Sequence, residues 1–168
     1  IDIDNRDEYD KAYISLQQYL VDKKVSPKKI ERALRAELLV SINILKQISG
    51  RGKLSAFQEF AKECELAGEK LVVFTWFLET SRFLKKKFPG AVAITGDETD
   101  EEVQANKEKF QTDPNCKMII VSYKRGGVGH TLTAASKVAM LEYGWTYKDQ
   151  SQAEDRLHRI GQLFMVNV

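Results

Sequence analysis

Cysteine and histidine are scarce in this sequence of 168 residues, and the few that occur argue against several kinds of site. The two cysteines, Cys64 and Cys116, cannot build a disulfide framework and do not have the spacing of metal ligands. His130 and His158 have no cysteine or histidine partners nearby, so we interpret both as packing or hydrogen-bonding residues. We therefore expect no protein-bound metal, and we expect an intracellular protein with reduced thiols.

Long apolar runs are missing as well. No run approaches the length that a membrane-spanning helix needs, and the first residues have no signal-peptide character. We therefore expect no association with a membrane. The sequence begins with Ile1 rather than Met, which suggests a fragment of a longer chain.

A large excess of charge of either sign is also absent, since 26 basic side chains accompany 24 acidic ones. A net charge of +2 does not by itself indicate a nucleic-acid-binding protein, so any binding of DNA must come from local patches. Hydrophobic residues make up 43% of the chain and charged residues 30%, as in ordinary soluble globular proteins. The length suits one domain with a core of its own.

The first part of the chain has the apolar periodicity of helices. Apolar and aromatic residues recur at spacings of three and four over residues 5–21, which predicts one helix. Ser26 and Pro27 are suited to begin a second helix, and Gly50-Arg51-Gly52 is expected to end it in a turn. A third helix is predicted over residues 53–67, closed by Gly68.

Strands and helices alternate in the rest of the chain. Apolar runs predict strands over residues 70–75, 91–94, 117–122, 137–141 and 164–168. Between them, helices are predicted over residues 78–88 and from a capping box of Thr99 and Glu102 to about Phe110. The alternation predicts an α/β fold, a parallel sheet with helices on both faces, preceded by an N-terminal helical segment. We expect residues 1–52 to pack as a lead-in segment on a lobe formed by residues 53–168.

Residues 118–135 combine an apolar strand with a glycine-rich loop. Glycines at positions 126, 127 and 129 follow the strand, and their backbone amides could lie close to a phosphate or ribose. The loop is not a Walker loop, because Gly-Lys-Ser/Thr is absent, and it lacks the third glycine of a dinucleotide fingerprint. Gly50-Arg51-Gly52-Lys53 is not a phosphate loop either, since no strand precedes it and Leu54 replaces the magnesium-binding hydroxyl.

Residues 150–162 are predicted to form a helix with two distinct faces. An apolar stripe suited to a core consists of Ala153, Leu157 and Ile160. The adjoining face carries two guanidinium groups and an amide, from Gln152, Arg156 and Arg159. Guanidinium groups offer a planar fork of donors that suits phosphate. The alternative is a surface helix whose arginines pair with Glu154 and Asp155.

The two motifs together resemble a known family. Ser122-Tyr-Lys-Arg-Gly-Gly-Val-Gly-His-Thr-Leu-Thr-Ala-Ala135 resembles motif V of the Swi/Snf-type helicase-like ATPases of helicase superfamily two. Gln152-Ala-Glu-Asp-Arg-Leu-His-Arg-Ile-Gly-Gln162 resembles their motif VI. The resemblance covers roughly residues 53–162 and implies the C-terminal of two RecA-like lobes, half of a motor that moves on double-stranded DNA. It implies a nuclear protein in a eukaryote and a cytoplasmic one in a bacterium or virus.

The resemblance implies that ATP and Mg2+ are held mainly by an N-terminal RecA-like lobe. That lobe carries the Walker lysine and an Asp-Glu motif in this family, and neither motif occurs here. Arg156 and Arg159 would act as arginine fingers on the γ-phosphoryl group, with Gln152 beside them. Gly127 and Gly129 would approach the nucleotide or the opposing lobe. The fragment alone is expected to be a monomer without ATPase activity.

The resemblance also implies contacts to the DNA backbone. Ser122 and Lys124 match positions at which motif V meets phosphate, and Thr95-Gly96-Asp97 matches a loop that does the same. Thr75 and Trp76 stand at the end of the motif IV strand, although Trp76 could equally be a core aromatic residue. Such contacts position the duplex rather than read its bases.

Several positions depart from the family pattern. Arg125 replaces the usual Ala and could share the phosphate contact of Lys124. Thr131, Glu142 and the segment 152–156 are closer to the subgroup that includes annealing helicases than to nucleosome remodellers. The alternative function is a non-catalytic nucleic-acid-binding or scaffold module on the same fold. A third alternative is the lobe of an RNA helicase of superfamily two, and the residues Asp155-Arg-Leu-His-Arg-Ile-Gly-Gln162 of motif VI disfavour it.

Overall fold

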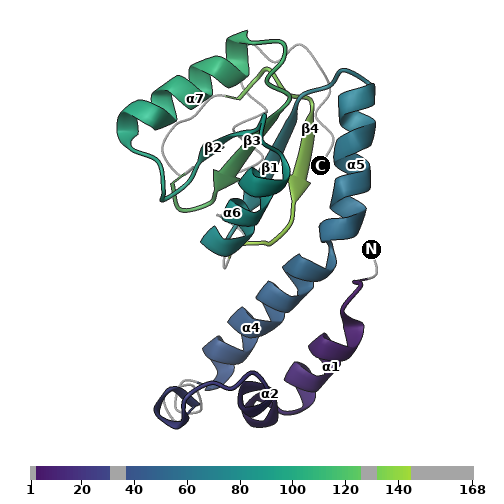
Figure 1. Cartoon of the computed structure of the whole chain (residues 1–168), viewed down its shortest axis with the longest axis vertical. Coiled ribbons are helices and arrows are strands. Elements are labelled where there is room, and N and C mark those ends of the chain that lie inside the picture. Colours follow the sequence, from purple (N-terminus) through teal and green to yellow (C-terminus); the bar gives the residue numbers. More distant parts are fainter. Residues whose placement is uncertain (1–2, 31–36, 126–131, 145–168) are drawn as a thin grey trace. The chain divides into compact units, whose positions relative to one another are not determined.

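The computed structural model describes residues 3–30, 37–125 and 132–144 (Figure 1). The chain divides into two compact units, Ile1–Ser55 and Ala56–Val168. The predicted arginine-bearing helix and the predicted strand over residues 164–168 lie outside the described residues. Across the described ranges, no helix combines the length and the apolar character needed to cross a membrane.

The first unit contains α1 (Arg6–Ile14), α2 (Leu16–Asp22) and α4 (Glu37–Gly52). The prediction of one helix over residues 5–21 was wrong, because the helix is interrupted at Ser15. Ser15 has extended backbone angles, and its side-chain oxygen accepts a hydrogen bond from the amide of Gln18 at 3.3 Å. Serine favours such an N-cap over a helix interior, so it starts a new helix instead of continuing the first.

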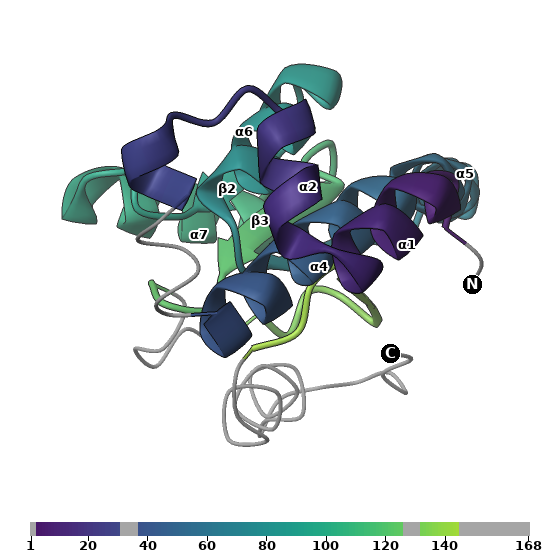
Figure 2. The ribbon, with the colours of Figure 1, turned by 90° about the horizontal axis from the view of Figure 1, so that it is seen from below.

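Helix α4 extends through the glycines at which a turn was predicted. The expected turn at Gly50-Arg51-Gly52 was wrong, since α4 continues to Gly52 and only Lys53 separates it from α5. The amide of Asp4 donates to the Gly52 carbonyl at 3.0 Å, and Asn5 Nδ2 donates to the Ile48 carbonyl at 2.9 Å. A Cβ at Gly52 would lie 2.7 Å from Cβ of Ile3. Glycine is therefore needed here for close packing beside α1, which lies along α4 (Figure 2).

Helix α5 (Leu54–Leu66) agrees with the helix predicted over residues 53–67. Its buried residues Phe57, Ala61 and Cys64 follow a spacing of four and three, which places them on one face. The helix ends where Gly68 adopts a φ of +72°, a left-handed conformation that glycine reaches without steric cost. The amide of Glu69 then donates to the Cys64 carbonyl at 2.9 Å, which satisfies one of the last carbonyls of the helix.

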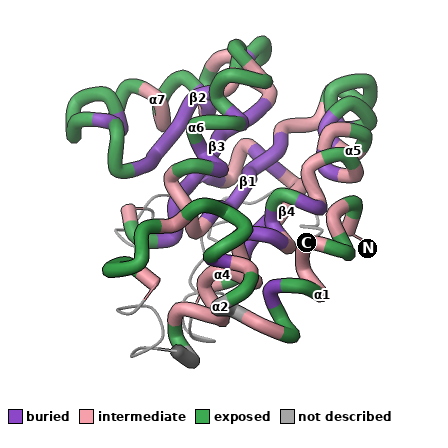
Figure 3. The backbone as a smooth tube through the Cα atoms, turned by 60° about the horizontal axis from the view of Figure 1, so that its bottom comes forward, coloured by how far each residue is buried: buried purple, intermediate pink, exposed green. Residues whose placement is uncertain are grey.

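A parallel four-stranded sheet forms the centre of the second unit, in the order β2-β3-β1-β4. Its strands are β1 (Leu71–Thr75), β2 (Val92–Ile94), β3 (Met118–Ser122) and β4 (Lys137–Met140). Every residue of β1, β2 and β3 is buried, and Figure 3 shows this as a continuous buried core through the sheet. The predicted parallel sheet and its first four strands are confirmed.

Helices cover both faces of this sheet. Val72, Phe74, Ile119 and Val121 belong to a core cluster that includes Val103 and Phe110 of α7 (Asp100–Thr112). Successive strand residues point to opposite faces, so Thr75 points to the face away from α7. There its hydroxyl lies 2.5 Å from that of Ser81 in α6 (Leu78–Lys87). The prediction of helices on both faces is therefore confirmed.

Candidate functional site

The four strands end at nearly the same level, and this brings the segments that carry the predicted DNA contacts to one edge. In the register of the sheet, Thr75 pairs with Ser122 and Ile94 pairs with Val121. On the other side of β1, the amide of Leu141 donates to the Phe74 carbonyl at 3.2 Å. The segments that follow each strand therefore leave the sheet together at its carboxyl edge, where ligands of open α/β sheets bind.

A hollow of about 420 Å³ lies at this edge. One part of its lining comes from the junction of β1 and α6, with Trp76, Phe77 and Leu78. The rest comes from the ends of β2 and β3, with Gly96, Ser122, Lys124 and Arg125. Five residues predicted from the sequence as DNA contacts thus line one hollow: Trp76, Gly96, Ser122, Lys124 and Arg125.

Trp76 is partly buried, and its ring lies between the core and a cation. The indole centroid is 6.1 Å from the ring of Tyr123, which itself packs 5.4 Å from Phe74 in the core. The ammonium group of Lys124 lies 5.5 Å from the centroid of the Trp76 ring, within the range of a cation–π interaction. Trp76 therefore packs against the core, as one interpretation held, and also contributes to the surface of the hollow.

Two predicted contacts, Thr75 and Thr95, have no exposed surface. The hydroxyl of Thr75 is paired with Ser81, and that of Thr95 donates to a carboxylate oxygen of Glu98 at 2.6 Å. Neither side chain can reach a phosphate from these positions. The Thr95 hydroxyl also accepts a hydrogen bond from the Asp97 amide at 3.3 Å, and Gly96 and Asp97 are the exposed residues that follow it.

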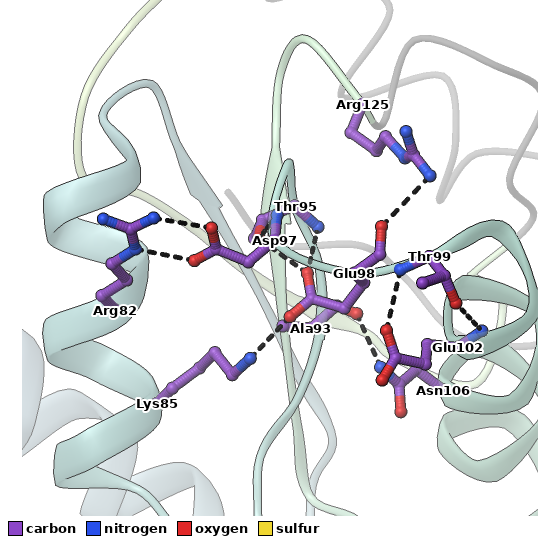
Figure 4. Close-up of polar contacts among 10 residues, drawn as sticks. All are labelled: Arg82, Lys85, Ala93, Thr95, Asp97, Glu98, Thr99, Glu102, Asn106 and Arg125. Atoms are coloured by element: carbon purple, nitrogen blue, oxygen red, sulfur yellow. Dashed lines mark hydrogen bonds and ion pairs between the residues drawn. The ribbon is translucent and has the colours of Figure 1, made fainter.

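Glu98 organises the loop that follows β2 (Figure 4). Its side chain is 5% exposed, and it accepts hydrogen bonds from the Thr95 amide at 2.8 Å, from the Thr95 hydroxyl and from Lys85 Nζ. Burial raises the pKa of this carboxyl group, but the hydrogen bonds from Lys85 and Thr95 outweigh burial and lower the pKa overall. Glu98 is therefore a buried anion that fixes the turn at Thr95.

Asp97 and Arg125 hold the same loop from its two sides. Arg82 of α6 donates two hydrogen bonds of 2.7 Å to the carboxylate of Asp97, and they lower its pKa. Arg125 donates to the Glu98 carbonyl at 3.2 Å (Figure 4). It also donates to Asp100 at 2.6 Å. The guanidinium of Arg125 thus connects the end of β3 with the start of α7. Whether it also meets phosphate stays a prediction.

Glu142, just beyond β4, is a second buried carboxylate and is 3% exposed. It accepts hydrogen bonds from the amides of Trp76 at 2.9 Å and Phe77 at 3.3 Å, and from the hydroxyl of Thr80. It thereby fixes the backbone between β1 and α6, where Trp76 and Phe77 line the hollow. Sequence patterns did not indicate this role, because its partners lie more than 60 residues away.

The residues predicted to face ATP cannot be placed. Gln152, Arg156, Arg159, Gly127 and Gly129 all lie outside the described residues. Among the residues that are described, no group of three or more His, Cys, Asp or Glu side chains could hold a metal ion. The acidic segment 97–102 is instead engaged in the loop and in the Thr99–Glu102 capping box that begins α7, as predicted.

Residues 52–161 match the family of the helicase conserved C-terminal domain. The chain is 32% identical over 124 residues to the DNA repair protein rad8 of Schizosaccharomyces pombe, covering 71% of this chain and 11% of rad8. It is 28% identical over 149 residues to the human lymphoid-specific helicase, covering 86% of this chain and 17% of that protein. The chain therefore spans less than a fifth of the length of these curated relatives.

The fold also matches a solved structure, an ATPase core of Sulfolobus solfataricus SWI2/SNF2 in complex with double-stranded DNA. The TM-score is 0.65 at 25% identity, and the match covers 95% of this chain and 35% of that chain. The closer resemblance to the annealing-helicase subgroup stays a prediction. The chain belongs to the helicase C-terminal domain family and has the fold of the C-terminal RecA-like lobe of Swi2/Snf2 helicase-like ATPases.

Proposed function

We propose that this chain is the second motor lobe of an ATP-dependent translocase on double-stranded DNA. The carboxyl edge of the sheet grips the phosphate backbone, with Lys124 as the main cation and Ser122 and the Gly96 loop beside it. The observation that carries the proposal is the convergence of these three segments on one hollow. Their chemistry, the exposed ammonium group of Lys124 and the exposed backbone at Gly96, suits phosphate oxygens and offers little to distinguish one base from another. Ser122 is 8% exposed, and its hydroxyl accepts a hydrogen bond from the Arg125 amide, so its part in the grip is a single donated hydrogen bond.

The buried carboxylates explain how the grip is held in place. Glu98 fixes the Thr95 turn, and Glu142 fixes the backbone at Trp76. Both carboxylates lie beneath the surface, so their charges do not face a bound phosphate directly. The exposed cations of the edge can therefore attract the backbone, while the loops that carry them keep their geometry.

The ATPase half of the proposal rests on the residues of motif VI. Arg156 and Arg159 reach ATP held on an N-terminal lobe of the same protein, and they stabilise the charge that develops on the transferring phosphoryl group. Arginine fingers contribute roughly 10³- to 10⁵-fold to such rates. Gln152 lies at the interface of the lobes, and Gly127 and Gly129 approach the nucleotide. Magnesium is held by the N-terminal lobe, and this chain alone, a monomer, does not hydrolyse ATP.

The expected cellular location of the protein follows from its proposed substrate, double-stranded DNA. A translocase on chromosomal DNA works in the nucleus of a eukaryote or in the cytoplasm of a bacterium or virus-infected cell. The relatives include a DNA repair protein, which supports this placement.

The salt dependence of duplex affinity in the full-length protein tests the phosphate grip. Each neutralised phosphate releases counterions, so Lys124→Ala should make the slope of log affinity against log salt shallower by roughly one unit. Affinity should fall by a similar factor for unrelated duplex sequences, because a phosphate contact carries no sequence information.

Lys86→Ala is the matched control. Lys86 is an exposed lysine in the last turn of α6, a helix that begins at the carboxyl edge and leads away from it. This variant should keep the slope of the wild type. Equal slopes for the wild type, Lys124→Ala and Lys86→Ala would show that DNA is gripped elsewhere and would overturn the proposal.

A further inference from the structure

The aromatic part of the hollow is not explained by a grip on phosphate. A phosphate backbone offers anionic oxygens and sugars, for which Ser122, Lys124 and the Gly96 loop are sufficient. The hollow is nevertheless lined on its other side by Trp76, Phe77 and Leu78. Apolar and aromatic surface beside cations is the combination that binds single-stranded nucleic acids, where bases stack while the backbone is neutralised.

The Trp76 ring is fixed in a way that suits stacking. Its backbone amide donates to Glu142 at 2.9 Å, and its ring packs 6.1 Å from that of Tyr123 at an angle of 45°. The Tyr123 ring is in turn anchored on Phe74, which is fully buried. An aromatic surface that is already ordered loses little conformational entropy when a ligand stacks on it.

Lys124 connects the aromatic ring with the phosphate contact. Its ammonium group lies over the Trp76 ring at 5.5 Å. A phosphate at the edge of the hollow is a stronger partner for this cation than the ring, because it carries a full negative charge. When the ammonium group moves to the phosphate, the ring face that it covered becomes available to an apolar, planar ligand.

The hollow also has room for such a ligand. Its volume of about 420 Å³ lies within the range typical of small-molecule sites. A Cβ added at Gly96 would meet no atom within 4 Å, so the glycine is not required by protein packing at this position. Gly96 lines the hollow and contributes no side chain to it.

We propose that the hollow binds one unpaired nucleobase, stacked on Trp76, next to the phosphate that Lys124 neutralises. The inference rests on the proposed function and deepens it, because it names the DNA structure that this lobe prefers. A paired base cannot enter the hollow without leaving its stack, whereas a base in a bulge or mismatch has already lost part of its pairing energy. The lobe therefore recognises distorted duplex DNA better than regular duplex DNA.

The test compares three short duplexes that bind the full-length protein without ATP. The first is fully paired, the second carries one extra unpaired adenine nucleotide, and the third carries one extra abasic nucleotide. Removal of a stacked base costs about five- to a hundredfold in affinity. The duplex with the unpaired adenine should therefore bind more tightly than the abasic one by a factor in this range.

Four variants separate stacking from a general loss of structure. Trp76→Phe should keep the preference for the unpaired base, and Trp76→Leu should bind the duplex with the unpaired adenine no more tightly than the abasic one. Gly96→Val, which adds a branched side chain to the lining of the hollow, should also lose this preference. Phe83→Leu removes an aromatic ring that is exposed on α6 and does not line the hollow, so it should keep the preference.

Equal affinity of the wild-type protein for the unpaired adenine and for the abasic nucleotide would overturn the inference. The phosphate grip would still stand in that case if Lys124→Ala reduced the salt slope for all three duplexes. A preference for the unpaired base that survives in Trp76→Leu would likewise contradict stacking on Trp76.

Discussion

The carboxylate of Glu98 accepts both the backbone amide and the hydroxyl of Thr95, at 2.8 and 2.6 Å. One buried anion thus closes the turn that follows β2, and Lys85 of α6 neutralises it from the other side. Since Arg125 at the end of β3 donates to the Glu98 carbonyl, three segments of the carboxyl edge meet at this residue (Figure 4). The geometry of the proposed DNA-contacting loop therefore depends on a residue whose side chain is buried.

Glu98→Gln should destabilise the protein by about 1–3 kcal/mol, the range for hydrogen bonds to a charged group whose partners are left buried. The amide can replace one acceptor but cannot neutralise Lys85 or accept all the hydrogen bonds of the carboxylate. Chemical denaturation of the two proteins measures the difference. Glu108→Gln, at an exposed position of α7, is the control and should change the free energy of unfolding by less than about 0.5 kcal/mol.

The contribution of Glu98 should disappear in acid. Its pKa in the folded protein lies below the ordinary value of 4.5, so the carboxylate stabilises the fold fully above that value. The stabilisation is lost as the pH falls through the lowered pKa of the folded state. The difference in free energy of unfolding between the wild type and Glu98→Gln should thus be constant near neutral pH and shrink below pH 4.5. A difference that grows in acid would show that Glu98 is not held as an anion.

Gly52→Ala should destabilise the helical unit, although alanine favours helices more than glycine. The new Cβ would lie 2.7 Å from that of Ile3, and overpacking of this kind costs about 1–3 kcal/mol. Gly90→Ala provides the matched comparison, because a Cβ at Gly90 would meet no atom within 4 Å. Thermal unfolding should show a lower midpoint for Gly52→Ala alone. Two variants with equal midpoints would mean that the segment before α1 does not pack on Gly52.

Local signals in the sequence were sufficient for much of the fold. The apolar runs predicted β1 to β4, and the Thr99–Glu102 pair predicted the capping box that begins α7. Both features arise from residues close together in the chain. The continuous helix to Gly52 was not predicted, and the contact that the structure shows there is a backbone hydrogen bond from Asp4, which lies 48 residues away in the chain.

The candidate site was predicted only in part for the same reason. The family motifs indicated the segments that meet at the carboxyl edge, and five of their residues line the hollow. They did not distinguish exposed from buried members, since the burial of Thr75 and Thr95 depends on contacts with Ser81 and Glu98. Nor did they reveal the hydrogen-bonding role of Glu142. Its hydrogen-bond partners follow β1, and the whole of β2 and β3 separates them from Glu142 in the chain.

We propose that this lobe completes an ATPase site and couples it to DNA. The most direct measurement is ATP turnover by the full-length protein, with and without duplex DNA, for the wild type and for Arg159→Ala. DNA should stimulate the wild type, and Arg159→Ala should lose roughly 10³-fold or more of the stimulated rate while it binds duplex DNA with unchanged affinity. Stimulated turnover that is unchanged in Arg159→Ala would contradict the role of Arg159 as an arginine finger.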